Sequence, residues 1–379
     1  TVGATKPALL EITPVPTPSN DNKSTYTFYS TLPGTINYSG SCDNDSYTNA
    51  SADNNTVIFD ALPDNTYSDC KISVTSNGVV SDNLTVSTFK IDTTPPDLDT
   101  VNIRSNNDNT TMAKVGDRIF LDLTFSENVN TPTVLIAGQS ASRHSGSGSS
   151  WVYRYDMRSS DSNGPVSLNV NFTDTLGNGP TTVTSTTNGS AVLFDKTAPT
   201  LNEITAVSTP TSDNTSDYTF YSSEAGTIGY VNCSSSTTSA TADNNTITFN
   251  ELADGTHNNC IITVTDSTGN TSENLEVSSF KIDTTAPTLS PVTAVPTLTG
   301  DSTPNYTFSS SEAGTITYGG ACGSSTSSAV TSTNKTVTLT QPDNSTALID
   351  GTYSDCTVRV TDSAGNVSDA LPVTPFTVS

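Results

Sequence analysis

Hydrophobic residues alternate with polar ones in short segments along the whole chain. Ile72 and Val74 alternate with polar neighbours, and Ile262 and Val264 repeat the arrangement far downstream. Successive side chains of a β-strand point to opposite faces, so this period of two predicts half-buried antiparallel strands. No segment sustains the 3.6-residue period of an amphipathic helix. The pattern therefore predicts an all-β protein.

A second regularity is a phrase that returns along the chain. It occurs at Phe89–Pro96, Phe194–Pro199 and Phe280–Pro287. Each copy closes a unit of roughly 90 to 105 residues, which suits one β-sandwich. The predicted domains are residues 1–91, 92–195, 196–283 and 284–379.

The repeats fall into two subtypes. Units one, three and four share a strand pattern at Tyr26–Ser30, Tyr218–Ser222 and Tyr306–Ser310. Unit two has other strands, including Leu121–Phe125 and Trp151–Tyr155. Both subtypes resemble the bacterial immunoglobulin-like repeats of secreted adhesins and other cell-surface proteins. The resemblance implies four tandem immunoglobulin-like β-sandwich domains in an extended array at the bacterial surface.

The composition limits the partners. Lys and Arg total 14 against 38 Asp and Glu, for a formal charge of −24. Such a chain repels nucleic acid and anionic membranes. No apolar run approaches the length of a membrane span. The given sequence shows no signal peptide, and we expect that it was either removed or never included. Hydrophobic residues make up 32%, and low hydrophobicity with high charge can indicate disorder, but the alternating strands argue against it.

The six cysteines are distributed by the repeat. Each unit carries two or none, which predicts the pairs Cys42–Cys70, Cys233–Cys260 and Cys322–Cys356. In an immunoglobulin-like sandwich these positions would join strands C and F of one sheet. Free thiols or a zinc site are the alternatives. Disulfides would place the protein outside the cell or at its surface.

The segment before the second cysteine resembles the tyrosine corner of immunoglobulin-like domains, in which the phenol bonds to upstream backbone. Tyr67 and Tyr353 occupy the corner position, and unit three has His257 there. We interpret His257 as a substitute for the tyrosine and not as a catalytic residue.

Acidic residues recur at the three predicted junctions. Each junction has one in the linker, one in the B–C turn and one in the F–G turn: Asp92, Glu127 and Asp174; Asp195, Glu224 and Asp266; Asp283, Glu312 and Asp362. Three carboxylates that converge without a basic partner are costly unless a cation neutralises them. Ca²⁺ accepts such oxygen ligands, so the trios predict calcium at the domain junctions. Some relatives in this broad family place calcium there.

A plain turn is the other interpretation of the F–G acids. Asp-x-x-Gly-Asn is a good hairpin turn, in which Asp bonds its own backbone. The acids are absent at the two ends of the array, where Leu32 and Ser379 stand instead. Turn chemistry does not predict that absence, and both interpretations stay open. The same absence leads us to expect that Thr1 and Ser379 lie near true ends of the array.

Unit two has two further features. The Ser- and Gly-rich segment Arg143–Ser150 is flexible by composition, and we expect a long hairpin loop there. Trp151 is expected in the core.

Three function classes follow. An enzyme is disfavoured, because no Ser/His/Asp or Cys/His grouping and no phosphate-binding loop are present. The favoured function is a non-enzymatic extracellular stalk or fibre subunit, with itself, a surface receptor or a glycan as partner. The alternative is a carbohydrate- or protein-binding module of a secreted adhesin.

Overall fold

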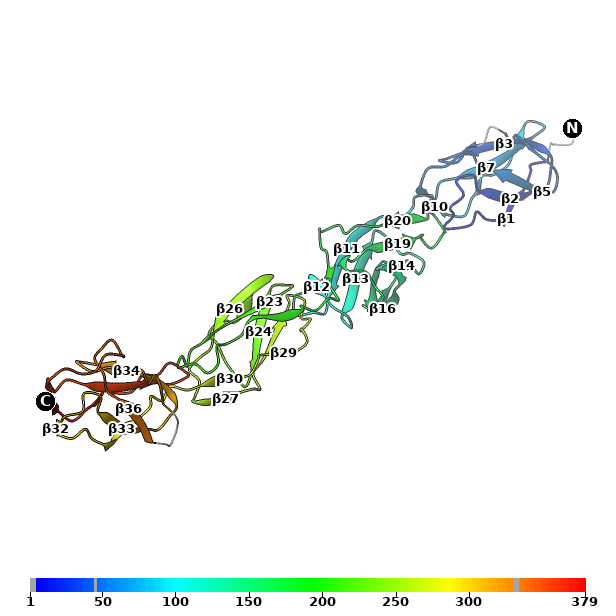
Figure 1. Cartoon of the computed structure of the whole chain (residues 1–379). Helices are drawn as coiled ribbons and strands as arrows, with labels where there is room; N and C mark the ends of the chain where they lie inside the picture. Colours follow the sequence, from blue (N-terminus) through cyan, green and yellow to red (C-terminus); the bar gives the residue numbers. More distant parts are fainter. Residues whose placement is uncertain (1–4, 44–45, 330–333) are drawn as a thin grey trace. The chain divides into compact units, whose positions relative to one another are not determined.

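The computed structural model describes residues 5–43, 46–329 and 334–379 (Figure 1). Every helix or strand assigned in these ranges is a β-strand, so the predicted all-β class is confirmed. The described part of the chain contains no helix that could cross a membrane. Two compact units divide the chain, Thr1–Lys196 and Thr197–Ser379, and Thr1 itself lies outside the described residues.

Each unit contains two hydrophobic cores, which we number one to four along the chain. The strands around the first core are β1 (Leu9–Thr13), β2 (Thr25–Ser30), β3 (Gly34–Ser39), β4 (Asn49–Ala50), β5 (Asn54–Ile58), β6 (Asn65–Tyr67), β7 (Lys71–Ser76), β8 (Val79–Val80), β9 (Leu84–Thr85) and β10 (Phe89–Ile91). The strands around the second are β11 (Leu98–Ser105), β12 (Met112–Ala113), β13 (Arg118–Phe125), β14 (Thr133–Ile136), β15 (Gln139–Ser140), β16 (Ser142–Ser147), β17 (Ser150–Asp156), β18 (Gly164–Pro165), β19 (Leu168–Phe172), β20 (Thr181–Val183) and β21 (Leu193–Phe194).

The second unit repeats this organisation. The strands around the third core are β22 (Leu201–Thr205), β23 (Asp217–Ser222), β24 (Gly226–Val231), β25 (Ser239–Ala240), β26 (Asp243–Thr248), β27 (Gly255–His257), β28 (Ile261–Thr265), β29 (Leu275–Glu276) and β30 (Phe280–Ile282). The strands around the fourth are β31 (Leu289–Thr293), β32 (Leu298–Thr299), β33 (Asn305–Ser310), β34 (Gly314–Gly319), β35 (Ser328–Ala329), β36 (Asn334–Thr338), β37 (Gly351–Tyr353), β38 (Thr357–Thr361), β39 (Leu371–Pro372) and β40 (Phe376–Val378).

Two main sheets enclose each core. Around the first, third and fourth cores a three-stranded sheet (β1-β2-β5, β22-β23-β26 or β31-β33-β36) faces a second sheet built on the pair β3·β7, β24·β28 or β34·β38. Around the second core β11-β13-β17-β16 faces β15-β14-β19-β20. In immunoglobulin lettering these sheets are A-B-E or A-B-E-D against C′-C-F-G. This strand order defines an immunoglobulin-like sandwich. The predicted four-domain boundaries stay a prediction.

The alternating pattern is what places the cores. In β13, Ile119, Leu121 and Leu123 are buried while the residues between them are partly exposed. Trp151, at 4% exposure, lies in the second core as expected. Because one face of each sheet meets solvent, alternate residues are enough to fill the interior.

The prediction of a long flexible loop at Arg143–Ser150 is wrong. Most of that segment is strand β16, which pairs antiparallel with β17. Its glycines allow the close pairing: a Cβ on Gly146, whose φ is +94°, would lie 2.2 Å from the carbonyl oxygen of Ser150. A serine- and glycine-rich composition indicates a flexible backbone, but pairing with β17 holds this segment in an extended strand.

The structure contains three disulfides, Cys42–Cys70, Cys233–Cys260 and Cys322–Cys356. Each pairing is the one that the repeat predicts, and no described cysteine is free. In the first core the bond links the segment after β3 to the residue that precedes β7, and these strands are antiparallel neighbours. The C–F placement expected from the resemblance is therefore observed.

The corner residues also behave as expected. The Tyr67 hydroxyl donates to the Pro63 carbonyl at 2.7 Å, and the Tyr353 hydroxyl donates to the Ile349 carbonyl at 2.9 Å. His257 Nε2 lies 2.9 Å from the Ala253 carbonyl, four residues upstream like its counterparts. Its ring stacks on Phe280 with centroids 5.3 Å apart. His257 therefore fills the structural role of the tyrosine.

The second core is an internal control for the disulfides, because it has none. Reduction should lower the stability of the three other cores by about 3 kcal/mol each, since the open chain regains loop entropy. Hydrogen exchange with mass spectrometry, with and without reductant, should show protection falling about 100-fold in their core strands. Peptides from β13, β17 and β19 should keep their protection. An equal loss there would contradict the prediction.

Candidate functional site

The trio Asp283, Glu312 and Asp362 converges within the second unit. Asp283 follows β30, Glu312 lies in the turn between β33 and β34, and Asp362 follows β38. One carboxylate oxygen from each lies within 4.8 Å of the other two. Asp362 is buried, at 9% exposure, and the other two are partly exposed. The sequence prediction thus brings the right three residues together here.

Asp362 is also a structural turn residue. Its Oδ1 accepts the backbone N–H groups of Ala364 at 2.8 Å and Asn366 at 2.9 Å, and its Oδ2 accepts the Asn366 side-chain amide at 2.9 Å. Gly365 supplies the positive φ, +95°, that this turn requires. A carboxylate accepts about four hydrogen bonds, so one acceptor direction remains for another partner.

The corresponding turns at Asp174 and Asp266 have the same bonds. Asp174 Oδ1 accepts from the backbone of Leu176 at 2.9 Å and Asn178 at 2.8 Å. Asp266 Oδ1 accepts from the backbone of Thr268 at 2.8 Å and Asn270 at 2.9 Å. The turn interpretation of these acids is therefore correct in all three places. The bonds leave a cation role open but do not require it.

The turn asparagine reaches the incoming linker. Asn366 Nδ2 donates to the main-chain carbonyl of Asp283 at 2.6 Å, and Asn178 Nδ2 donates to that of Asp92 at 2.8 Å. The structure uses their amides to hold the linker backbone against the turn.

The expectation that the acids lack a basic partner is wrong for two of the trios. Lys281 Nζ lies 2.8 Å from Asp283 Oδ2, and Lys90 Nζ lies 2.8 Å from Asp92 Oδ2. The signal was in the phrase Phe-Lys-Ile-Asp, because residues two apart along an extended chain share a face. Each lysine supplies part of the neutralisation that was assigned to a cation.

Negative charge still dominates around the glutamates. Partial burial, followed by the Asp283 and Asp362 carboxylates, raises the pKa of Glu312 above its usual value, and Lys281 offsets this in part. Burial, with Asp92 and Asp174, raises the pKa of Glu127 in the same way. The lysines therefore reduce the crowding of carboxylates without removing it.

The structure does not establish a cluster of three carboxylates for either of the other two trios. Among the described residues, Asp92, Glu127 and Asp174 do not bring one oxygen each within 4.8 Å of one another. The trio Asp195, Glu224 and Asp266 takes residues from both units, and its assignment stays a prediction from the sequence.

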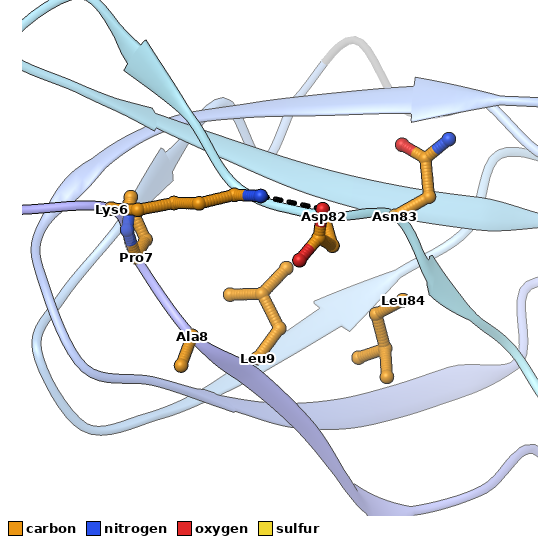
Figure 2. Close-up of a pocket in the computed structure, with 7 residues that line it drawn as sticks. All are labelled: Lys6, Pro7, Ala8, Leu9, Asp82, Asn83 and Leu84. Atoms are coloured by element: carbon orange, nitrogen blue, oxygen red, sulfur yellow. Dashed lines mark hydrogen bonds and ion pairs between the residues drawn. The ribbon is translucent and has the colours of Figure 1, made fainter.

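A groove of about 290 Å³ lies beside β1. It is lined by Lys6, Pro7, Ala8, Leu9, Asp82, Asn83 and Leu84. Figure 2 shows Lys6 reaching across it to Asp82, with Nζ 2.5 Å from Oδ1. An equivalent groove lies between Pro287–Leu289 and Asp369–Leu371, where Ala286 replaces the lysine. Because the groove recurs with different side chains, we interpret it as the space between the edges of two sheets.

The comparisons with known proteins identify no family. No protein-family model matches the chain, and a search of curated proteins finds no relative. Among solved structures, a three-domain stretch of titin is 10% identical, with a TM-score of 0.27, and the match covers 75% of this chain and 98% of that one. The human desmocollin-1 ectodomain is 11% identical, with a TM-score of 0.28, covering 96% and 77%. Scores this low carry no argument, so the immunoglobulin-like class stands on the strand order.

Replacing Glu312 by Gln should stabilise the second unit at neutral pH in the presence of a chelator, by about 0.5 kcal/mol. The raised pKa means that the folded state binds a proton at Glu312 more tightly than the unfolded state does. The cost of ionised Glu312 therefore appears as the pH rises through that pKa and is absent in acid. Chemical unfolding of the wild type and E312Q at several pH values measures it.

The matched control is Glu276→Gln, an exposed glutamate on β29. It should change stability little at any pH. If E312Q were neutral or destabilising at pH 7, the three carboxylates would not repel one another as the geometry implies.

Proposed function

We propose that this chain is a non-enzymatic extracellular structural or adhesive protein, a stalk or fibre subunit at a bacterial cell surface. The observation that carries the proposal is the asparagine clamp on the linker, Asn178 to Asp92 and Asn366 to Asp283. A clamp between the two cores of each unit suits a molecule that transmits force.

Further bonds join the cores within each unit. Asn20 Nδ2 donates to the Leu176 carbonyl at 2.8 Å, and the Ser212 backbone N–H donates to the Ala364 carbonyl at 3.1 Å. Each joins a loop of one core to the F–G turn of the next. Contacts between domains are usually small enough to permit motion, so such bonds limit bending at the linker.

An extracellular setting is supported by the covalent and surface chemistry. Three disulfides persist only where the surroundings are oxidising. The charge of −24 keeps the chain soluble and repels anionic surfaces.

The residues that commonly perform catalysis have structural tasks here. The described cysteines are paired, His257 fills a corner, and His144 packs edge-on against Phe120 with centroids 5.4 Å apart. The F–G aspartates hold their own turns. These roles support a non-enzymatic function.

Deleting the gene for this chain should reduce attachment of the cells or remove their surface fibres. An adhesion assay and negative-stain microscopy measure these two effects. Complementation with the double variant N178A/N366A should restore the protein but only part of the attachment under flow, because the linkers lose their clamps. The control N83A/N274A removes two exposed asparagines. Full attachment in the clamp variant would contradict a mechanical role for the linker bonds. Unchanged attachment and unchanged surface fibres in the deletion strain would contradict the structural role itself.

We also propose that Asp283, Glu312 and Asp362 bind Ca²⁺. Calcium at Asp92, Glu127 and Asp174, and at Asp195, Glu224 and Asp266, stays a prediction from the sequence. Oxygens 2.3–2.6 Å from one calcium ion are at most about 5.2 Å apart. The 4.8 Å spacing of this trio fits that limit. Lys281 would have to leave Asp283 when the ion binds, so the lysine and calcium compete.

Calorimetric titration tests this. The wild type should bind Ca²⁺ with a Kd of about 10⁻⁴–10⁻³ M, and Asp283→Ala should lose at least one site. Free Ca²⁺ at ten times Kd should raise the free energy of unfolding of the second unit by about 1.4 kcal/mol. Lys281→Ala should tighten binding, because the competitor is gone. The control Asp369→Ala should bind as the wild type does, and no heat at millimolar calcium would leave the acids as turn residues.

A further inference from the structure

The first strand of the sandwiches around the first, third and fourth cores lies at the edge of its sheet. β1, β22 and β31 pair with β2, β23 and β33 on one side only. Each also lies beside a short strand of the opposite sheet, β9, β29 or β39. We call the space between these two sheet edges the seam. The attachment of each first strand therefore depends on its backbone bonds to one neighbour and on the side-chain bonds that it makes across the seam.

Around the third core a glutamate of β22 makes these side-chain bonds. Glu203 Oε2 accepts the backbone N–H of Ser278 at 2.9 Å, and Oε1 accepts the Ser278 hydroxyl at 2.7 Å. The buried Tyr218 hydroxyl donates to Oε2 at 3.0 Å. Partial burial raises the pKa of Glu203, but these hydrogen bonds outweigh it and leave the pKa below its usual value. Because bonds to an ionised carboxylate are about twice as strong as neutral ones, Glu203 fastens β22 across the seam.

The same bonds to a serine recur around the first core. Glu11 Oε2 accepts the backbone N–H of Ser87 at 2.9 Å, and Oε1 accepts the Ser87 hydroxyl at 2.5 Å. Among the described residues the Tyr26 hydroxyl has no hydrogen-bond partner, so the bonds to serine are the part that recurs. Lys6 adds an ion pair to Asp82 across this seam (Figure 2). We call Glu11 and Glu203 the seam glutamates.

The sandwich around the fourth core has the donors of this arrangement but not the acceptor. Pro291 of β31 pairs with Phe308 in the register in which the seam glutamates pair with the equivalent phenylalanines of β2 and β23. Thr374 takes the place of the serines, because in all three sandwiches the valine before this position bonds the carbonyl of the second disulfide cysteine. Proline offers no carboxylate to Thr374. The Tyr306 hydroxyl is buried and has no hydrogen-bond partner in the described part of the chain.

Strand β31 is also more exposed than its counterparts. Pro291 is exposed, whereas the seam glutamates are partly buried, and Leu289 is the one residue of β31 that is not fully exposed. A buried hydroxyl without a partner is destabilising, and detachment of β31 would let water reach Tyr306. The loss of the seam bonds and the hydration of Tyr306 both favour detachment of this strand.

The rest of this sandwich is held by contacts that do not involve β31. Strand β32, which follows β31 in the chain, pairs in parallel with β40. The Ser379 backbone N–H donates to the Thr299 carbonyl at 3.2 Å and extends that pairing. The disulfide Cys322–Cys356 lies further along the chain than both β31 and β32. The chain can therefore detach as far as β32 while the two sheets stay packed.

We propose that β31 is a releasable strand, which leaves the sandwich around the fourth core while the rest of that sandwich stays folded. The seam glutamates prevent the same release of β1 and β22. The proposal rests on the proposed structural function, because a pull along such a molecule reaches β31 through the linker at Asp283. Release then lengthens the chain without unfolding a core.

Hydrogen exchange with mass spectrometry on the full, oxidised chain tests the release. Peptides that cover β31 should have protection factors about 10-fold or more below those that cover β22. Peptides that cover β38 should stay as protected as those that cover β28, because the two sheets do not separate. Equal protection of β31 and β22 would overturn the proposal. So would equally low protection of β31 and β38, which would mean that this sandwich opens as a whole.

Two substitutions at one position separate the carboxylate from the proline. Pro291→Glu supplies the missing acceptor and should raise the protection of β31 by about 10-fold. The matched control Pro291→Ala removes the proline without adding a carboxylate and should raise it less than about 3-fold. Equal effects of the two substitutions would contradict the role of the seam bonds.

The reverse substitution removes the bonds where they exist. Glu203→Ala should lower the protection of β22 by about 10-fold, and β28 should keep its protection. The control is Glu276→Ala, an exposed glutamate on β29, which should leave both strands unchanged. Thermal unfolding establishes that each variant is folded. Unchanged protection of β22 in Glu203→Ala would overturn the proposal.

Stretching single oxidised chains between their ends tests the strand under load. The wild type should show a short extension before the larger unfolding steps, and Pro291→Glu should remove it. A wild type without this short extension, or one that persists in Pro291→Glu, would overturn the proposal. The attachment of cells that lack the gene tests the structural function separately, because exchange and stretching are measured on the isolated chain.

Discussion

Burial of one face of every main strand is the constraint on which the rest of the structure depends. Each sheet faces water on one side, so alternate residues must supply an interior that is small to begin with. The third core has 13 buried apolar residues and a disulfide, whereas the second has 19, including Trp151, and no disulfide. The larger core is therefore the one without a covalent cross-link. Disulfide and apolar burial act here as alternative ways to stabilise the same sandwich.

The turns at the junctions show how one side chain serves both fold and linker. Asp362 closes the F–G turn through its own backbone, and Asn366 bonds both that carboxylate and the linker carbonyl of Asp283. The turn thus sets the position of the carboxylate trio, and Lys281 moderates its charge. A site with three acids and one lysine retains negative charge that an added cation would neutralise further.

The outer faces of the sheets are free of the packing constraint, and their composition therefore differs from core to core. The outer face of β11-β13-β17-β16 has Arg104 stacked on Phe120, while several exposed acids lie on the strands and turns around the third core. Since the fold tolerates either, these surfaces are where differences in binding are expected.

The sequence by itself determined the β class, the disulfide pairs and the corner residues, because each follows from local alternation or from comparing one repeat with another. It also identified Asp283, Glu312 and Asp362 as one cluster. It missed β16, since serine and glycine form a strand there only because β17 pairs with them. It overlooked Lys281 beside Asp283, although the spacing of two was visible. The row Arg104, Phe120 and Arg154 was decided by tertiary structure alone, because register across strands brings together residues that have no local pattern in common.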